Sequence, residues 1–466
     1  MNNASINIQG VAVITLLVGS GVLLTMVRYD LGPKGGLARG RQWLLATALG
    51  TGILAFALKL VIILAIANFP ETLVEPLIQK DIVERPVAVA DPLYGMTAPQ
   101  RFVWQPLPMG SESASSGSNA TTANLTYVWE ALPEQAPSPE NNPVTPEKVA
   151  LGERLFFDKN LSLDGTLSCS ACHDVIGGSG DDSRATSIGI NGQQGGRNAP
   201  TVWNTAFQSV LFWDGRAASL EEQAKGPLVN PIEMGMVSLT AVEQRVQQDT
   251  TYHLAFAQAF GIEQPITIDR IAEAIAAYER TLITPDTPYD RFVRGDLDAL
   301  SSEQLRGMAL FQSQGCVSCH FGPNFSGASV FDSRAPMRIF PIYPTPYEQQ
   351  YELTQDSGAA GAGSGRGSWR ISSLRNVALT GPWFHNGSVT DLAEAVRVMS
   401  SVQLGRTGRY LLWADTNKVL TRLDRPVLDE HEVNDIVAFL HALSSEKLVQ
   451  RIHMSKAQAG VAYVNN

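Results

Sequence analysis

The segments Cys169-Ser170-Ala171-Cys172-His173 and Cys316-Val317-Ser318-Cys319-His320 repeat one motif, C-x-x-C-H, at two places in the chain. In this motif the two thiols form thioethers to the vinyl groups of a haem, and the adjacent histidine ligates the iron. A C-x-x-C pair can instead belong to a zinc knuckle, a redox dithiol or a disulfide. The chain contains 4 cysteines, the two motifs use all of them, and a histidine follows each pair directly. The sequence therefore predicts two covalently bound haems of the c type.

The length and the charge of the chain limit the kinds of protein that it can be. Its 466 residues leave room for a membrane anchor and about two to three domains of ordinary size. The formal net charge of −10 argues against nucleic acid as a partner, because phosphate binding requires a basic surface. An acidic surface is better suited to a basic protein as electron donor.

Two apolar stretches near the N-terminus, residues 11–27 and 43–67, are long enough or nearly so to cross a bilayer. The loop between them carries one acid, Asp30, and four basic residues, Arg28, Lys34, Arg39 and Arg41. By the positive-inside rule this loop lies in the cytoplasm, so both chain ends face outward. The first stretch also resembles the core of a signal peptide, but the residues before it carry no charge. We expect residues 1–68 to form a retained transmembrane helical hairpin.

Composition and periodicity divide the rest of the chain. Residues 69–145 are rich in proline and serine and contain little periodicity, which predicts a tether. We expect an N-terminal haem domain, a C-terminal haem domain and a tail, at residues 146–295, 296–447 and 448–466.

Apolar spacing predicts helices at residues 146–157, 240–260, 268–282, 390–399 and 429–443. Ser301 followed by Gln304 predicts a capping box for a helix that leads to Cys316. Residues 321–367 are an irregular excursion, too long to be a simple connection.

Several short motifs outside the two haem-attachment segments occur in a fixed order along the chain. They are LGERLFF at 151–157, RNAPT at 197–201, FWDGRA at 212–217, EM at 233–234, AYERTL at 277–282, LRN at 374–376, FHNG at 384–387, and Met399. This set resembles the bacterial di-haem cytochrome c peroxidases. The resemblance implies a mainly α-helical fold with two c-type cytochrome-like haem domains. It also implies an enzyme that reduces hydrogen peroxide to water.

The resemblance assigns the ligands of the second iron. His173 and His320 are the proximal ligands by their motifs, and the family pattern makes Met399 the sixth ligand of the C-terminal haem. A thioether favours the reduced iron and raises its potential, so this haem would store an electron. The related enzymes that mature methylamine dehydrogenase carry a tyrosine at the corresponding position. Met399 therefore favours a peroxidase over a protein-oxidising enzyme.

The N-terminal haem departs from the best-known family pattern, in which a distal histidine blocks the iron at rest. The flanking motifs place Ile190 at that position, and no histidine lies between His173 and His253. Because isoleucine cannot ligate iron, we expect an open haem that needs no reductive activation. Met234 or Met236 could still cap it, and this alternative stays open.

The resemblance also implies roles for three side chains in peroxide cleavage. Glu233 matches the acid/base residue, and its position before an apolar residue suggests a desolvated carboxyl with a raised pKa. Gln223 matches the residue that positions peroxide or water, and Trp213 matches an electron relay between the haems.

Asn198, Thr380 and Pro382 match the calcium site of the family, which is made of an amide oxygen, backbone carbonyls and waters. Without a carboxylate such a site should be weak. Arg216 and Arg375 are expected to pair with haem propionates.

Together these features predict a membrane-anchored peroxidase whose electrons come from a small redox protein, a cytochrome c or a cupredoxin. Covalent haem attachment of this kind takes place outside the cytoplasmic membrane, so we expect an inner-membrane anchor and a periplasmic head. Two alternatives remain: a di-haem oxidase acting on a protein or organic substrate, and an electron-transfer or sensor subunit of a membrane complex. The resemblance also makes a homodimer an expected assembly.

Overall fold

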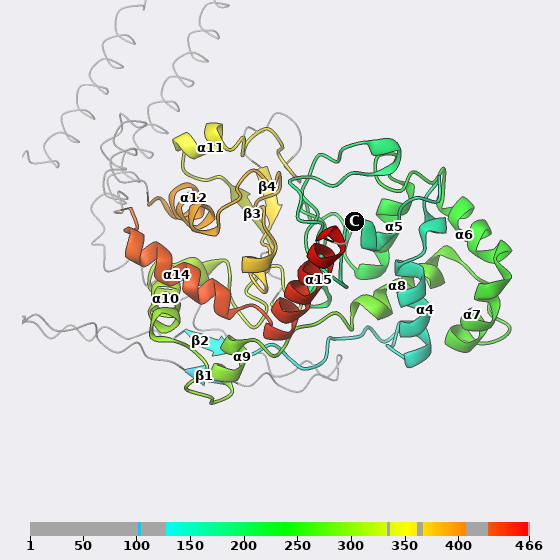
Figure 1. Ribbon diagram of the computed structural model, residues 1–466, viewed down its shortest axis with the longest axis horizontal. Coiled ribbons are helices and arrows are strands. Elements are labelled where there is room, and N and C mark those ends of the chain that lie inside the picture. The colour runs from blue at the N-terminus through cyan, green and yellow to red at the C-terminus, as the bar shows by residue number, and fades with distance from the viewer. Residues whose placement is uncertain (1–100, 104–126, 333–335, 361–366, 407–426, 465–466) are drawn as a thin grey trace, which may run out of the picture. The chain divides into compact units, whose positions relative to one another are not determined.

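The computed structural model describes residues 101–103, 127–332, 336–360, 367–406 and 427–464 (Figure 1). All of these residues belong to one compact unit, Ile82–Asn466. The predicted transmembrane hairpin at residues 1–68 therefore lies outside the described residues. Within the described ranges, no helix is both long and apolar enough to cross a membrane.

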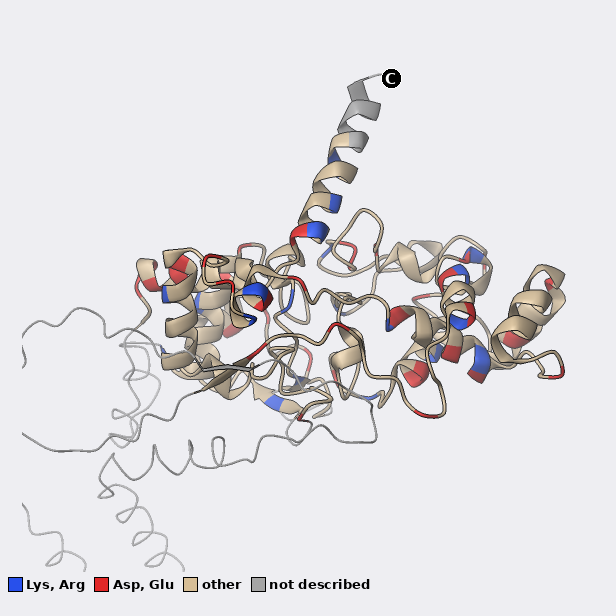
Figure 2. Cartoon of the chain, turned by 90° about the horizontal axis from the view of Figure 1, so that it is seen from below, with Lys and Arg blue, Asp and Glu red and all other residues tan. Residues whose placement is uncertain are grey.

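The described part of the chain is mainly helical, as the sequence predicts. Its α-helices are α4 (Pro146–Phe156), α5 (Leu220–Val229), α6 (Leu239–Gln248), α7 (His253–Phe260), α8 (Ile268–Glu279), α9 (Pro288–Val293), α10 (Ser302–Ser313), α11 (Pro346–Gln350), α12 (Leu392–Leu404), α14 (Glu430–Ala442) and α15 (Glu446–Val464). Short 3₁₀ turns include η2 (Cys169–Ala171), η5 (Thr250–Tyr252) and η6 (Cys316–Ser318). The strands form two antiparallel pairs, β1 (Arg101–Val103) with β2 (Val128–Glu130) and β3 (Met337–Phe340) with β4 (Gly367–Arg370). Figure 2 shows acidic and basic residues interspersed along these elements.

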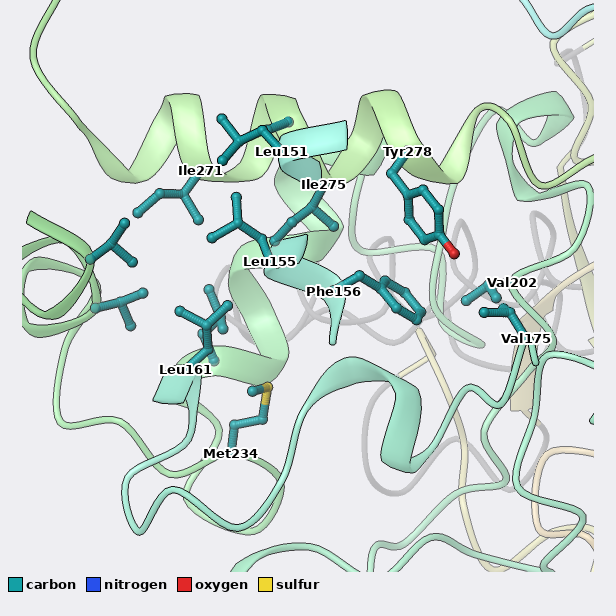
Figure 3. Close-up of a cluster of buried hydrophobic side chains, with 14 of the residues drawn as sticks. Leu151, Leu155, Phe156, Leu161, Val175, Val202, Met234, Ile271, Ile275 and Tyr278 are labelled. Atoms are coloured by element: carbon teal, nitrogen blue, oxygen red, sulfur yellow. The ribbon is translucent and has the colours of Figure 1, made fainter. Parts of the chain in front are cut away.

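The first hydrophobic cluster lies where α4 crosses α8 (Figure 3). Helix α4 begins after Thr145, whose side chain accepts a hydrogen bond from the Lys148 backbone, and proline occupies its first turn. Apolar residues of the two helices then meet on one face each: Leu151, Leu155, Phe156, Ile271, Ile275 and Tyr278. Gly152 permits the close crossing, because a Cβ at this position would collide with the Ala274 carbonyl oxygen.

A second cluster repeats this arrangement where α10 meets α14. Both helices begin with capping boxes, the predicted pair Ser301 with Gln304 and a second pair, Asp429 with Glu432. Gly307 permits the close crossing here as Gly152 does in the first cluster, because a Cβ at Gly307 would collide with the Asp435 carbonyl oxygen of α14. Each C-x-x-C-H motif therefore follows a helix that crosses another helix over a glycine.

The excursion at residues 321–367, which the sequence predicts to be irregular, contains strand β3 and the short helix α11. Strand β3 pairs with β4 from Met337 opposite Arg370 to Phe340 opposite Gly367. Phe340 and Trp369 then join a third buried cluster with Val398 and Val402 of α12. The excursion thus covers the helix that carries Met399.

Two further predictions differ from the structure. The helix predicted over residues 240–260 is broken into α6 and α7, because the Asp249 side chain accepts a hydrogen bond from the Thr251 backbone and begins η5. The tether predicted over residues 69–145 does not extend to its expected end. Trp129 is fully buried in the second cluster, and the Leu132 backbone donates to Asp290 Oδ1 at 2.8 Å.

The sequence predicts no element after residue 443, but the chain continues there as helix α15. Figure 2 shows the described turns of this helix standing out from the other helices. Its first turns pack against the first cluster through Leu448, which is 2 % exposed. Arg451 donates to the Val175 carbonyl oxygen at 3.0 Å. The last helix therefore contacts the loop that follows the first motif.

Candidate functional site

The second motif opens onto a cavity of about 260 Å³. Cys316, Cys319 and His320 line this cavity together with Met399 of α12. Most of the other lining side chains are aromatic or aliphatic, including Phe311, Phe340, Trp383, Leu392, Ile436 and Leu440. An apolar cavity that holds two thiols, an imidazole and a thioether fits a haem of the c type.

His320 is oriented by a hydrogen bond from Nδ1 to the Phe325 carbonyl oxygen at 3.1 Å. Burial lowers the pKa of His320, which keeps the imidazole neutral. A neutral imidazole whose Nδ1 is engaged in this way presents Nε2 to a metal. The local geometry is therefore that of an iron ligand.

The first motif has the same proximal arrangement. Nδ1 of His173 lies 3.3 Å from the Gly180 carbonyl oxygen, and burial lowers the pKa of this histidine as well. Cys169 packs against the first hydrophobic cluster, which includes Trp203. Two buried polar atoms beside this motif, Trp203 Nε1 and Glu279 Oε2, have no hydrogen-bond partner within the described residues. Such atoms are compatible with the polar edge of a haem.

Two of the other uses of a C-x-x-C pair, a redox dithiol and a zinc site, do not fit these surroundings. Burial raises the pKa of both Cys169 and Cys316 to about 12, whereas a redox dithiol has a lowered pKa. Across the part of the chain that the structure describes, no group of three or more His, Cys, Asp or Glu residues could hold a metal ion. The two pairs therefore do not form a shared zinc site.

Ile190 and Glu233 meet beside the first motif. The Ile190 backbone N–H donates to the Glu233 carbonyl oxygen at 3.0 Å, and the side chain of Ile190, 3 % exposed, packs against Gly235. Burial raises the pKa of Glu233, against a smaller opposing effect of Arg216. Burial also raises the pKa of Cys172, and the charge of Glu233 adds to this increase. The carboxyl is thus within electrostatic reach of a haem-attaching thiol.

The two methionines that could cap the first haem both lie in the first cluster. Met234 and Met236 are 5 % and 3 % exposed. Figure 3 shows the Met234 sulfur beside Leu161, among the aliphatic side chains. Packing thus accounts for the burial of both residues. Gln223 is partly buried on α5 and is not among the residues that line the second cavity.

Trp213 lies where the two sites meet. Its Nε1 donates to the Asn198 carbonyl oxygen at 2.8 Å, and Asn198 belongs to the RNAPT segment that follows the first motif. Its side chain also lines the second cavity and packs against the third cluster. The indole therefore contacts the second site while it is bonded to a segment of the first.

The three residues predicted to hold calcium, Asn198, Thr380 and Pro382, all line the second cavity. Nδ2 of Asn198 donates to the Arg184 carbonyl oxygen at 2.9 Å. Pro382 follows a cis peptide bond. No carboxylate is among the described residues that line this cavity, so any cation here would be bound by neutral oxygens.

Arg375 does not have the predicted role of a propionate partner. Its guanidinium is fully buried and bonds to Asp290 at 2.6 Å and to the Pro323 carbonyl oxygen at 2.6 and 2.8 Å. The same group lies over the rings of Tyr289 and Phe325. Arg375 therefore supports the loop behind His320. Arg216 is half exposed and pairs with Asp214.

The sequence gives no role to His385 beyond its place in the FHNG motif. This residue is 3 % exposed and stacks on Trp369 with ring centroids 4.0 Å apart. Burial lowers the pKa of His385 to about 4, and its Nε2 has no hydrogen-bond partner within the described ranges. The ring also lines the second cavity. A neutral imidazole is thus available to a group bound there.

Known proteins share these features. The family model for di-haem cytochrome c peroxidase matches residues 146–298. The cytochrome c551 peroxidases of Pseudomonas aeruginosa and Nitrosomonas europaea are 36% and 37% identical over alignments that cover 74% and 73% of this chain and 93% and 90% of those proteins. The methylamine utilization protein MauG of Methylorubrum extorquens is 35% identical, with 67% of this chain and 83% of that protein covered. A solved structure of a MauG-like protein associated with microbial copper homeostasis is 30% identical, with a TM-score of 0.57 over 69% of this chain and 96% of that chain.

Proposed function

This chain belongs to the di-haem cytochrome c peroxidase family, and we propose that it reduces hydrogen peroxide to water with electrons from a cytochrome c or a cupredoxin. The observation that carries the proposal is the difference between its two sites. The second motif shares its cavity with the thioether of Met399. The first motif lies beside a buried apolar side chain, Ile190, and a partly buried carboxyl, Glu233.

The proposed reaction takes up two electrons and two protons for each peroxide, and forms two waters. A bound haem supplies the iron that exchanges electrons with the peroxide. Glu233 takes a proton from one peroxide oxygen and returns it to the oxygen that leaves. Its raised pKa suits this exchange, because a desolvated carboxyl accepts and releases protons closer to neutral pH. Gln223 is proposed to orient the peroxide or a water.

The second site is proposed to store an electron and pass it to the first. His320 and Met399 would hold the haem there, and a thioether favours the reduced iron. Trp213 is proposed as the relay, since its indole lines this cavity and bonds to Asn198, in the segment that follows the first motif. We also propose that the first site is open at rest, because Ile190 offers no ligand and both nearby methionines pack in the first cluster.

The remaining features of the proposal concern the setting of this chemistry. We propose a hairpin anchor at residues 1–68 in the inner membrane, a periplasmic head with haem domains at 146–295 and 296–447, and a homodimer or a membrane-complex partner. We propose a weak calcium site at Asn198, Thr380 and Pro382. Its support is that these residues line one cavity.

A low-temperature spin-resonance spectrum of the fully oxidised protein, followed by addition of peroxide, tests this function. We expect a high-spin signal from one haem that is lost on peroxide addition without prior reduction. Two low-spin haems that stay inert until half-reduction would contradict the open site. Two haems that stay inert even after half-reduction would contradict the peroxidase and support an electron-transfer protein.

A further inference from the structure

One ion-pair network holds the chain on both sides of the Trp213 indole. Nη1 of Arg197 lies 2.7 Å from Oδ2 of Asp214, the residue that follows Trp213. Nε and Nη2 of Arg197 lie 2.6 and 3.1 Å from the two carboxylate oxygens of Asp356. Arg197 also precedes Asn198, whose carbonyl oxygen accepts the indole N–H at 2.8 Å. The arginine therefore connects the residue after the tryptophan with the segment that accepts its hydrogen bond.

Asp356 reaches this network from the excursion at residues 321–367, 159 residues after Arg197. Its Oδ1 also accepts a hydrogen bond from the Gly358 backbone at 2.8 Å, which fixes the carboxylate. The side chains of Arg197, Asp214 and Asp356 are 26%, 16% and 35% exposed, so water shields the pairs only in part. A bidentate contact between an arginine and a carboxylate fixes the relative orientation of the two groups in addition to pairing their charges.

The same arginine reaches the aromatic wall of the second cavity. Its guanidinium carbon lies 5.1 Å from the centroid of the Trp369 ring, which stacks on His385. The His385 carbonyl oxygen in turn accepts a hydrogen bond from the Asn198 backbone at 2.8 Å. Arg197 is therefore held next to both the Asn198 segment and the wall of the second cavity.

We propose that Arg197 and Asp356 are positioning residues for electron transfer, and that the excursion supplies Asp356 to lock the Trp213 indole between the two haem sites. The inference rests on the proposed relay role of Trp213. It also gives a function to an excursion to which the sequence assigns none. Without the Asp356 carboxylate, Arg197 keeps Asp214 as its remaining ion-pair partner, and the Asn198 segment loses one of the contacts that hold it against the indole. Electron transfer depends steeply on such distances, so a small displacement slows it.

The test uses the full-length protein with both haems attached, in five forms. Asp356→Asn keeps the shape of the side chain and an oxygen for Gly358 but loses the charge, and Asp356→Glu keeps the carboxylate. Trp213→Phe removes the relay. Asp435→Asn is the matched control, because it breaks another bidentate pair, Arg306 with Asp435 at 2.8 and 2.9 Å, on α10 and α14.

Two measurements distinguish a displaced Trp213 indole from a general loss of structure in the variant. In the first, protein with only its second haem reduced is mixed with hydrogen peroxide, and the absorption of that haem gives its rate of oxidation. In the second, ultraviolet resonance Raman without peroxide reports the indole hydrogen bond of Trp213, isolated as the difference from Trp213→Phe. The reduction potential of each haem is measured in every form, because a changed driving force would also change the rate.

We expect Asp356→Asn to slow the oxidation of the second haem about tenfold, since a small misplacement of a working group costs this much or more. Its indole band should shift toward a weaker hydrogen bond, Asp356→Glu should restore most of both signals, and Asp435→Asn should match the wild type. If the second haem is oxidised slowly in Trp213→Phe but at the wild-type rate in Asp356→Asn, the positioning role is overturned and the relay role stands. If the second haem is oxidised at the wild-type rate in Trp213→Phe, the relay role is overturned and this inference with it. Shifted haem potentials in Asp356→Asn would also overturn the positioning role.

Discussion

Replacing Arg375 with methionine should strongly destabilise the part of the protein around the second motif. Arg375 and Asp290 are 2.6 Å apart, and both side chains are 0% exposed. The substitution leaves the Asp290 carboxylate buried without its cation and removes both hydrogen bonds to the Pro323 carbonyl oxygen. Breaking a buried ion pair by removing one partner costs about 3–5 kcal/mol. Methionine fills much of the vacated space, so most of the loss should come from the unpaired charge.

Guanidinium unfolding of the haem-loaded protein, followed by tryptophan fluorescence, measures this loss. The absorption of the second haem should change in the same variant, because the carbonyl oxygen that binds His320 comes from Phe325 in the loop that Arg375 supports. Arg306→Met is the control, since its pair with Asp435 is exposed and should leave the midpoint unchanged. An Arg375→Met midpoint equal to that of the control would refute the structural role of the buried pair.

Four other perturbations have definite expected results. Glu233→Gln should lower steady-state peroxide turnover by about 10²–10⁴-fold with unchanged haem spectra. Because burial raises the pKa of Glu233 and only its ionised form accepts a proton, the wild-type rate should rise with pH through a pKa above the usual glutamate range, and Glu233→Gln should lack this rise. Met399→His should lower the reduction potential of the second haem in a spectroelectrochemical titration. Gly152→Ala should lower the Tm, since overpacking against the Ala274 carbonyl oxygen costs about 1–3 kcal/mol. His385 has a pKa of about 4 when folded and about 6.5 when unfolded, so the unfolded chain binds the proton first as pH falls. The denaturant midpoint should therefore decrease as the pH is lowered from about 6.5 to about 4, and it should decrease less in His385→Gln.

Local patterns predicted the helical framework well. The apolar spacing of Leu151 and Leu155 and the capping pair of Ser301 with Gln304 depend only on neighbouring residues, and both helices form where expected. The haem motifs are equally local, since five consecutive residues carry each one. Met399 was assigned only through the family resemblance, and the structure places it in the cavity of His320.

Contacts between distant residues were not predictable from such patterns. Asp290 and Arg375 are separated by 85 positions, so nothing near Arg375 indicated that its partner would be a carboxylate rather than a propionate. The burial of Trp129 has the same origin, because its neighbours in the sequence are those of a linker while its contacts lie in the second cluster. At Asp249 a side chain that bonds to its own backbone outweighs the helical spacing on either side.

The glycine crossings at Gly152 and Gly307 share one local geometry. At each crossing the glycine faces a carbonyl oxygen, of Ala274 in one case and Asp435 in the other, and an aromatic residue follows four positions later, Tyr278 or Phe439. The same kind of glycine-mediated crossing thus occurs twice, while α5, α6 and α7 contact the first helix pair and α12 contacts the second. Such an arrangement lets the two haem sites differ in function, because the loops and added helices around each site can change while the helix crossing that supports it stays the same.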